Sequence, residues 1–420
     1  MADYRLATMP SKKVCMKILT AYGGGVANIT GAQYTAFGRD REVARFNQTL
    51  KMTREASGRM ELFIGPYGVG KSFVLSLFQA LAVKKNYVVM SADLTASKWF
   101  AGTATEKQGL NLYRDLIKNT TIKGCPTNAN AFDVILRNWY DDLVEKTGGG
   151  FSEIMMQFNK DTEDCRYLTM YNDIRNAILS RFKEFQDGVS ESKAIEFFLA
   201  NITKKTDAKA IGAADYIRDA KWFDVMNTYS HIFSKAGYAG LILLFDQADY
   251  ILNLSKNDRQ QNYETMLTMW NAINEGRTEY LSIMVFASEN LVDDPKRGTI
   301  QYQALDDRLK GANRLDVLSD DYMVALLLRL CQIHETAYSW ESKLTEDDAR
   351  DFVQEMLPRT GMSRNCIRPI TVAWIKKLDD MQVGNVLDSD VYENMVESEV
   401  AKNDELSGIP ESFPEDRWPS

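Results

Sequence analysis

The stretch that most constrains the fold of this chain is Gly65-Pro66-Tyr67-Gly68-Val69-Gly70-Lys71-Ser72. It matches the phosphate-loop pattern G-x-x-x-x-G-K-[ST] at every fixed position. Residues 60–64, just before it, are mostly apolar and indicate a buried strand, and residues 73–81 have the spacing of a helix. The sequence therefore predicts a strand, a phosphate-binding turn and a helix in direct succession.

This succession of elements determines which residues could hold a nucleotide. Glycines let the backbone turn sharply and approach a phosphate closely, and the following helix directs its N-terminal N–H groups at that phosphate. We expect Lys71 to reach the outer phosphates of ATP and the Ser72 hydroxyl to ligate Mg²⁺. Phe73 opens the helix and completes the predicted binding segment. A chance glycine-rich turn is the alternative, but it does not explain the flanking strand and helix.

Composition limits the class of protein. The chain has 420 residues, which favours two or three domains, and its 45% hydrophobic and 26% charged residues are ordinary for a globular protein. It contains no apolar run that could span a membrane and no apolar segment typical of a secretory signal near residue 1. The five cysteines are scattered without a C-x-x-C pair, which argues against a disulfide framework or a zinc site. We predict a cytoplasmic protein without a membrane partner.

The charged and histidine residues give weaker signals. The net charge of −8 does not indicate a nucleic-acid-binding chain as a whole, although local basic faces remain candidates. These faces are Lys204-Lys205, Lys376-Lys377 and the set Arg359, Arg364 and Arg368, each of which could equally be a solvated surface. The two histidines, His231 and His334, lie in apolar helical context, so we interpret them as structural.

The next part of the chain predicts a parallel sheet with a helical insertion. Residues 87–92 form a second apolar strand after the predicted helix, and such a strand–helix–strand unit implies parallel strands. From residue 104 to 221 the apolar residues recur at helical spacing instead. Its aromatic residues are expected in a core rather than on a base-stacking surface: Trp139, Tyr140, Phe182, Phe185, Phe197 and Phe198.

A third apolar strand pattern ends in a carboxylate. Residues 241–246 read Leu-Ile-Leu-Leu-Phe-Asp, and Asp246 is expected to hold the Mg²⁺ shell. The next residue is Gln247, whose neutral amide can orient a water molecule but cannot accept its proton. Asp249 and Glu289 are the nearest carboxylates that could replace a base. Another apolar strand, residues 280–288, leads into Ser288-Glu289-Asn290.

The remaining segments complete the predicted organisation. Residues 37–43, Phe-Gly-Arg-Asp-Arg-Glu-Val, precede the phosphate loop and begin a helix. After residue 318, Ser319 and Thr345 are helix caps, and a third helix opens near residues 363–370. We predict an α/β fold with these boundaries: N-terminal arm 1–35, nucleotide-binding core 36–103 with 222–318, helical insertion 104–221, all-helical lid 319–398, and acidic tail 399–420.

Taken together, these motifs resemble those of one family. The Gly-Arg-acidic box, the phosphate loop, the long insertion, the helix from Leu327 to His334 and the Ser-Arg-Asn-Cys-Ile-Arg segment at 363–368 occur in this order. This order is similar to that of the ATP-binding proteins of bacterial BREX phage-exclusion systems, an origin-recognition-type AAA+ lineage. The resemblance covers residues 35–385 and implies a P-loop AAA+ core that binds ATP and Mg²⁺.

The resemblance also implies roles for residues around the nucleotide. Arg39 lies in the box that packs the nucleotide base, although the same residues could simply start a helix with an acidic first turn. Active members of this class usually carry Glu where this chain has Gln247, which places fast hydrolysis in doubt. Ser288 and Asn290 match the position that senses the γ-phosphate, or they form an ordinary polar strand end.

Two further arginine roles follow from the resemblance. Arg308 is our choice for the arginine finger that reaches a neighbouring subunit's γ-phosphate, with Arg314 as the runner-up and an ordinary surface arginine as the alternative. Arg364 matches the lid arginine that couples nucleotide state to lid angle.

Three functions are consistent with the sequence. The first is an ATP-dependent switch or motor in an antiphage defence complex, which assembles with its own copies or with other subunits and acts on double-stranded DNA or a partner protein. The second is a scaffold that binds ATP without useful turnover, which Gln247 favours. The third is a replication initiator or loader, but this class normally carries a winged helix, for which little chain remains after the lid. A small-molecule kinase is supported by fold analogy alone.

Overall fold

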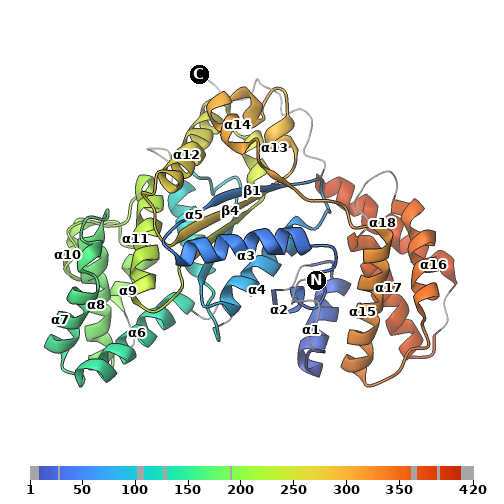
Figure 1. Ribbon diagram of the computed structural model, residues 1–420, viewed down its shortest axis with the longest axis horizontal. Coiled ribbons are helices and arrows are strands. Elements are labelled where there is room, and N and C mark those ends of the chain that lie inside the picture. Colours follow the sequence, from blue (N-terminus) through green and yellow to red (C-terminus); the bar gives the residue numbers. More distant parts are fainter. Residues whose placement is uncertain are drawn as a thin grey trace. The chain divides into compact units, whose positions relative to one another are not determined.

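The computed structural model divides into two compact units (Figure 1). The first unit comprises Met1–Val43, Gly65–Leu77 and Leu315–Ser420, and the second comprises Ala44–Ile64 and Phe78–Arg314. The structure describes residues 9–26, 29–101, 108–125, 130–189, 192–360, 367–385 and 388–407.

The second unit is built on a parallel sheet of five strands in the order β2-β3-β4-β1-β5. The strands are β1 (Met60–Ile64), β2 (Val88–Asp93), β3 (Leu241–Asp246), β4 (Leu281–Ala287) and β5 (Asn313–Arg314). All residues of β1, β3 and β4 are buried, which explains why these strands read as continuous apolar runs. The predicted parallel sheet is confirmed, and the carboxyl ends of its strands share one edge.

Helices follow β2 where the insertion was predicted. They are α5 (Gln108–Lys118), α6 (Ala131–Thr147), α7 (Phe151–Asp161), α8 (Tyr171–Asp187), α9 (Lys193–Phe198) and α10 (Lys205–Lys209). Trp139 and Phe182 contact each other edge to face and are almost fully buried. The six aromatic residues highlighted from the sequence are all buried, so the prediction of a core is confirmed.

The rest of the second unit flanks the strands. Its helices are α11 (Trp222–Lys235), α12 (Lys256–Asn274), α13 (Asn290–Asp293) and α14 (Gln303–Leu309). Helices α3 (Asp40–Arg54) and α4 (Lys71–Lys84) begin in the first unit and end in the second. Stacking of Phe46 on Phe78 joins the second-unit parts of α3 and α4.

Among its described residues, the first unit consists of helices, their connecting segments and the phosphate loop. It contains α1 (Lys12–Gly23), α2 (Ile29–Ala32), α15 (Asp320–Tyr338), α16 (Glu346–Met356), α17 (Ile367–Gln382) and α18 (Ser389–Ser407). Helix α1 packs against α15 and α17, and Ile18 is buried in the same core as Leu327 and Trp374. The segment expected as an arm therefore contributes to the core that α15 and α17 form.

The two predicted helix caps in this unit are confirmed, whereas the last helix extends further than predicted. Ser319 accepts a hydrogen bond from the Tyr322 N–H, and Thr345 forms a reciprocal capping box with Asp348. Helix α18 continues to Ser407, so it covers the first part of the segment expected to be a tail from residue 399. The four cysteines in the described ranges are buried, and they form no disulfide with one another. None of the described helices has the length and apolarity needed to cross a bilayer.

Candidate functional site

The phosphate loop leads directly from the end of β1 to the start of α4. Strand β1 ends at Ile64, the loop runs through residues 65–70, and α4 starts at Lys71. Gly68 and Gly70 adopt left-handed backbone conformations, with φ of 76° and 96°, which side chains other than glycine adopt only at a cost. The first turn of α4 contains no acidic residue, so its positive end faces the loop without a competing carboxylate.

The side chains of the loop and of the first turn of α4 differ in how far they are exposed. Val69 is fully buried, whereas Tyr67 is 41% exposed and Ser72 is also exposed. Phe73 and Pro66 are half-buried. The Ser72 hydroxyl at the start of α4 therefore lies where an incoming ion can reach it.

Lys71 folds back over the loop. Its Nζ donates hydrogen bonds to the carbonyl oxygens of Gly65 and Pro66, each at 3.0 Å. These two bonds hold the ammonium group at the loop. The arrangement of amides, glycines and a lysine therefore fits a polyphosphate chain.

Arg39 supports the same loop through hydrogen bonds to backbone carbonyl oxygens. Its side chain is 2% exposed; Nη2 donates to the Val69 carbonyl, and Nη1 donates to the Asp316 carbonyl at 2.7 Å. A Cβ added to Gly70 would lie 3.4 Å from Nη2, so the loop approaches the guanidinium closely. The guanidinium thus links the loop to the segment before α15, a contact that the sequence did not predict.

Asp246 ends β3, as predicted, and is 7% exposed. Its Oδ1 accepts a hydrogen bond from the Gln247 N–H at 2.8 Å. Gln247 is exposed and left-handed, with φ of 56°, so the chain turns sharply after the carboxylate. A carboxylate oxygen is a ligand that Mg²⁺ prefers, and Asp246 fits that role chemically.

The two carboxylates predicted as substitute bases are both engaged. Asp249 Oδ1 accepts a hydrogen bond from the Ser288 N–H at 2.8 Å, which joins the turn after β3 to the end of β4. Glu289 accepts from Arg314 at 3.3 Å. Ser288 is half-buried and Asn290, at the start of α13, is exposed.

The two arginine-finger candidates differ in their partners. Arg314 also pairs with Asp293 at 3.0 Å, and these carboxylates raise the pKa of its guanidinium. Arg308, exposed on α14, donates to the Asn271 amide oxygen at 3.2 Å and to the Ala304 carbonyl at 2.8 Å. Arg308 is therefore held by neutral groups, whereas Arg314 is neutralised locally. Arg364 lies outside the described residues.

Asp93 is a carboxylate to which the sequence reasoning assigned no role. It ends β2 and pairs in register with Asp246 on β3. Paired residues of adjacent parallel strands direct their side chains to the same face, about 4.8 Å apart along the sheet. Asp93 is exposed, but its surroundings shield the carboxyl from part of the solvent, which raises its pKa, and the Lys98 ammonium opposes that rise. The available signal was the one used for Asp246, a carboxylate at the end of an apolar strand.

A parallel sheet with a phosphate loop after β1 and a carboxylate at the end of β3 defines a mixed α/β protein with a P-loop-type core. Comparison with known families gives the more specific assignment. Residues 11–389 match the family described as "BREX system ATP-binding protein BrxC/D", so the chain belongs to this family of ATP-binding phage-defence proteins. No curated protein matches the chain.

Proposed function

We propose that this protein is a Mg-ATP-dependent AAA+ switch or slow ATPase of a BREX antiphage complex. The observation that carries the proposal is the phosphate loop itself, at which Lys71 is held and to which Arg39 donates a hydrogen bond. The loop and α4 bind the phosphates through backbone N–H groups, and Lys71 neutralises the outer phosphates. Ser72 and Asp246 are the residues that would hold Mg²⁺, which supplies charge neutralisation to the phosphates.

Hydrolysis is expected to be slow because the residue after Asp246 cannot take a proton. Gln247 can orient water, as glutamine does in some P-loop hydrolases. Among the nearby carboxylates, Asp249 holds the Ser288 amide and Glu289 is paired with Arg314. Asp93 is the third candidate base, because it ends β2 in register with Asp246 on the neighbouring strand.

Assembly is the second part of the proposal. An arginine finger must be exposed and free of a carboxylate that would neutralise it, and Arg308 meets both conditions better than Arg314. Strand β4 lies between β1 and β3, so Ser288 follows the strand that separates the phosphate-loop strand from the Asp246 strand. This order supports a sensing role for Ser288 and Asn290. We propose that ATP favours a cytoplasmic assembly of copies or defence subunits that acts on DNA or a partner protein.

Turnover separates the switch from the scaffold alternative. We would measure Mg-ATP hydrolysis by the native protein, Lys71→Ala and Gln247→Glu, with and without duplex DNA. Native turnover that Lys71→Ala abolishes supports the ATPase. ATP binding without turnover, with hydrolysis gained in Gln247→Glu, supports the scaffold. Size measured with and without ATP tests assembly, and an ATP-insensitive size in the native protein contradicts the proposed oligomerisation.

A further inference from the structure

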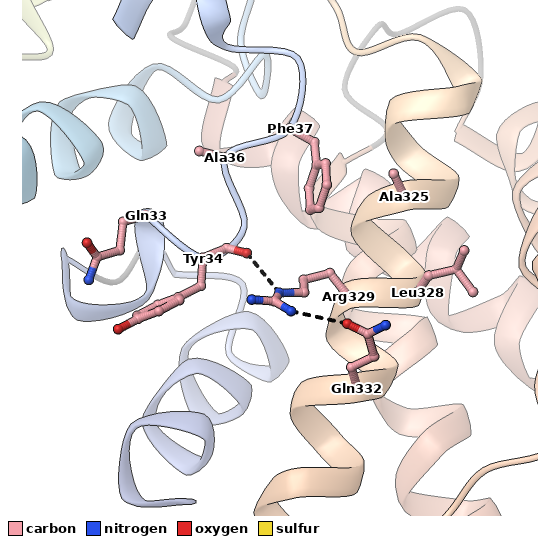
Figure 2. Close-up of a pocket in the computed structure, with 8 residues that line it drawn as sticks. All are labelled: Gln33, Tyr34, Ala36, Phe37, Ala325, Leu328, Arg329 and Gln332. Carbon is pink, nitrogen blue, oxygen red and sulfur yellow. Dashed lines mark hydrogen bonds between the residues drawn. The ribbon is translucent and has the colours of Figure 1, made fainter. Parts of the chain in front are cut away.

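A pocket in the first unit lies apart from the phosphate loop. Its volume is about 260 Å³, and it is formed by the segment 33–37 after α2 and by one face of α15 (Figure 2). The α15 residues that line it are Ala325, Leu328, Arg329 and Gln332, which recur at helical spacing. Pockets for drug-sized ligands occupy about 300–1,000 Å³, so this one admits little more than a single ring system.

The lining combines apolar surface with a fixed cation. Figure 2 shows the Arg329 guanidinium between the Tyr34 carbonyl and the Gln332 side chain, with the Phe37 ring above them. Arg329 Nε donates to the Tyr34 carbonyl at 3.3 Å, and Nη1 donates to Gln332 Oε1 at 3.2 Å. These bonds fix the plane of the guanidinium.

The charge of the pocket favours a ligand rich in acceptors. The eight residues that line it include no carboxylate. Burial lowers the pKa of the Arg329 guanidinium, which means that its positive charge is poorly solvated there. Ring nitrogens and carbonyl oxygens on the edge of a planar ring would stabilise that charge, while Phe37 and Leu328 provide apolar contact for the ring face.

The neighbouring helix α1 carries several lysines. Helix α1 packs against α15, and the Tyr22 hydroxyl on α1 donates to Thr35, between the lining residues Tyr34 and Ala36, at 2.8 Å. These contacts place α1 next to both elements that form the pocket, α15 and the segment 33–37. Residues 6–38 contain Lys12, Lys13 and Lys17 but no acidic residue, although the chain as a whole is acidic. Lys13 and Lys17 are exposed.

From this combination we infer that the pocket receives an unpaired base of single-stranded nucleic acid, whose backbone phosphates follow the lysines of α1. Arginine and glutamine read the edges of purines, and aromatic rings carry unstacked bases. Lysines contribute affinity through phosphates without reading sequence. The site lies outside the phosphate loop, so it extends the proposed function by naming the form of nucleic acid recognised.

The test uses the full chain without ATP and a fluorescein-labelled single-stranded oligonucleotide that contains purines. Anisotropy gives its affinity, and the same strand with abasic positions, the matching duplex and GMP are compared. Ala325→Phe fills the pocket without changing charge, and Arg329→Gln removes the cation. We expect each to weaken binding of the intact strand about tenfold and to leave the abasic strand unaffected. Lys13→Gln should weaken both strands and lower the salt dependence.

Matched controls separate this result from loss of folding and from failure of the ATP site. Lys343→Gln removes an exposed charge and Arg350→Gln a half-buried one elsewhere in the same unit, and both variants should bind the strand like the native protein. Lys71→Ala should also bind it normally. Equal affinity for the intact and abasic strands would overturn the inference, and so would tighter binding of the duplex. Binding of GMP without binding of the strand would also overturn it, as would native affinity for the strand in well-folded Ala325→Phe and Arg329→Gln.

Discussion

Replacing Arg39 by methionine tests whether this residue supports the phosphate loop or contacts the nucleotide base. Methionine keeps much of the side-chain volume but removes both hydrogen bonds. The Val69 carbonyl belongs to a fully buried residue and would lose a bond to a charged donor, at a cost of about 1.5–3 kcal/mol. Asp316 is exposed, so water can replace the bond to its carbonyl, and that loss adds about 0.5–1 kcal/mol.

The combined loss is therefore about 2–4 kcal/mol, shared between folding and ligand binding. We expect ATP affinity to fall at least about tenfold. If the loop binds the phosphates as proposed, inorganic tripolyphosphate should lose as much affinity as ATP. Calorimetry with both ligands measures this, and Arg41→Met on the exposed side of α3 is the control. A variant that binds tripolyphosphate normally but ATP poorly would refute the support role and favour contact with the base.

Two further predictions concern assembly and pH. Arg308→Ala should abolish ATP-dependent assembly and any ATP turnover that assembly stimulates, which size-exclusion chromatography with ATP and hydrolysis assays measure. Arg314→Ala should mainly lower the melting temperature, because it leaves Glu289 and Asp293 unpaired. The reverse pattern would exchange the roles of the two arginines. Burial lowers the pKa of His231; the Glu279 and Asp164 carboxylates oppose this lowering, and the Lys235 ammonium adds to it. As the pH falls, the unfolded chain therefore takes up a proton near pH 6.5 before the folded protein does. The free energy of unfolding should therefore fall as pH decreases below about 6.5, and His231→Gln should flatten this dependence in melts from pH 8 to 5.5; an unchanged slope would contradict it.

The sequence predicted those parts of the fold that depend on local pattern. Residues 60–64 and 241–246 were recognised as strands because a parallel sheet buries both faces. Ser319 and Thr345 were recognised as caps because a cap bonds to backbone within a few residues. Strand β5, only Asn313–Arg314, was missed because it has no apolar run and is defined by its pairing with Phe63 and Ile64.

The candidate site was predictable where chemistry follows motif and not where it depends on distant contacts. Lys71, Ser72 and Asp246 occupy positions that the loop and strand patterns specify. The contact between Arg39 and the Asp316 carbonyl joins residues far apart in the chain, and no local spacing indicates it. The pairing of Arg314 with Asp293 also depends on how the chain folds back after α13. Asp93 could have been chosen from its position at a strand end, but its register with Asp246 required the sheet.

Equilibrium binding of Mg-ATP by the native protein and Lys71→Ala tests most directly whether the phosphate loop is the nucleotide site. Lys84→Ala, in the last turn of the same helix and exposed, is the matched control. Loss of a charged donor to the phosphates should weaken binding about tenfold to a hundredfold in Lys71→Ala and leave Lys84→Ala unchanged. Native affinity in a folded Lys71→Ala protein would contradict the assignment of this loop as the site of ATP.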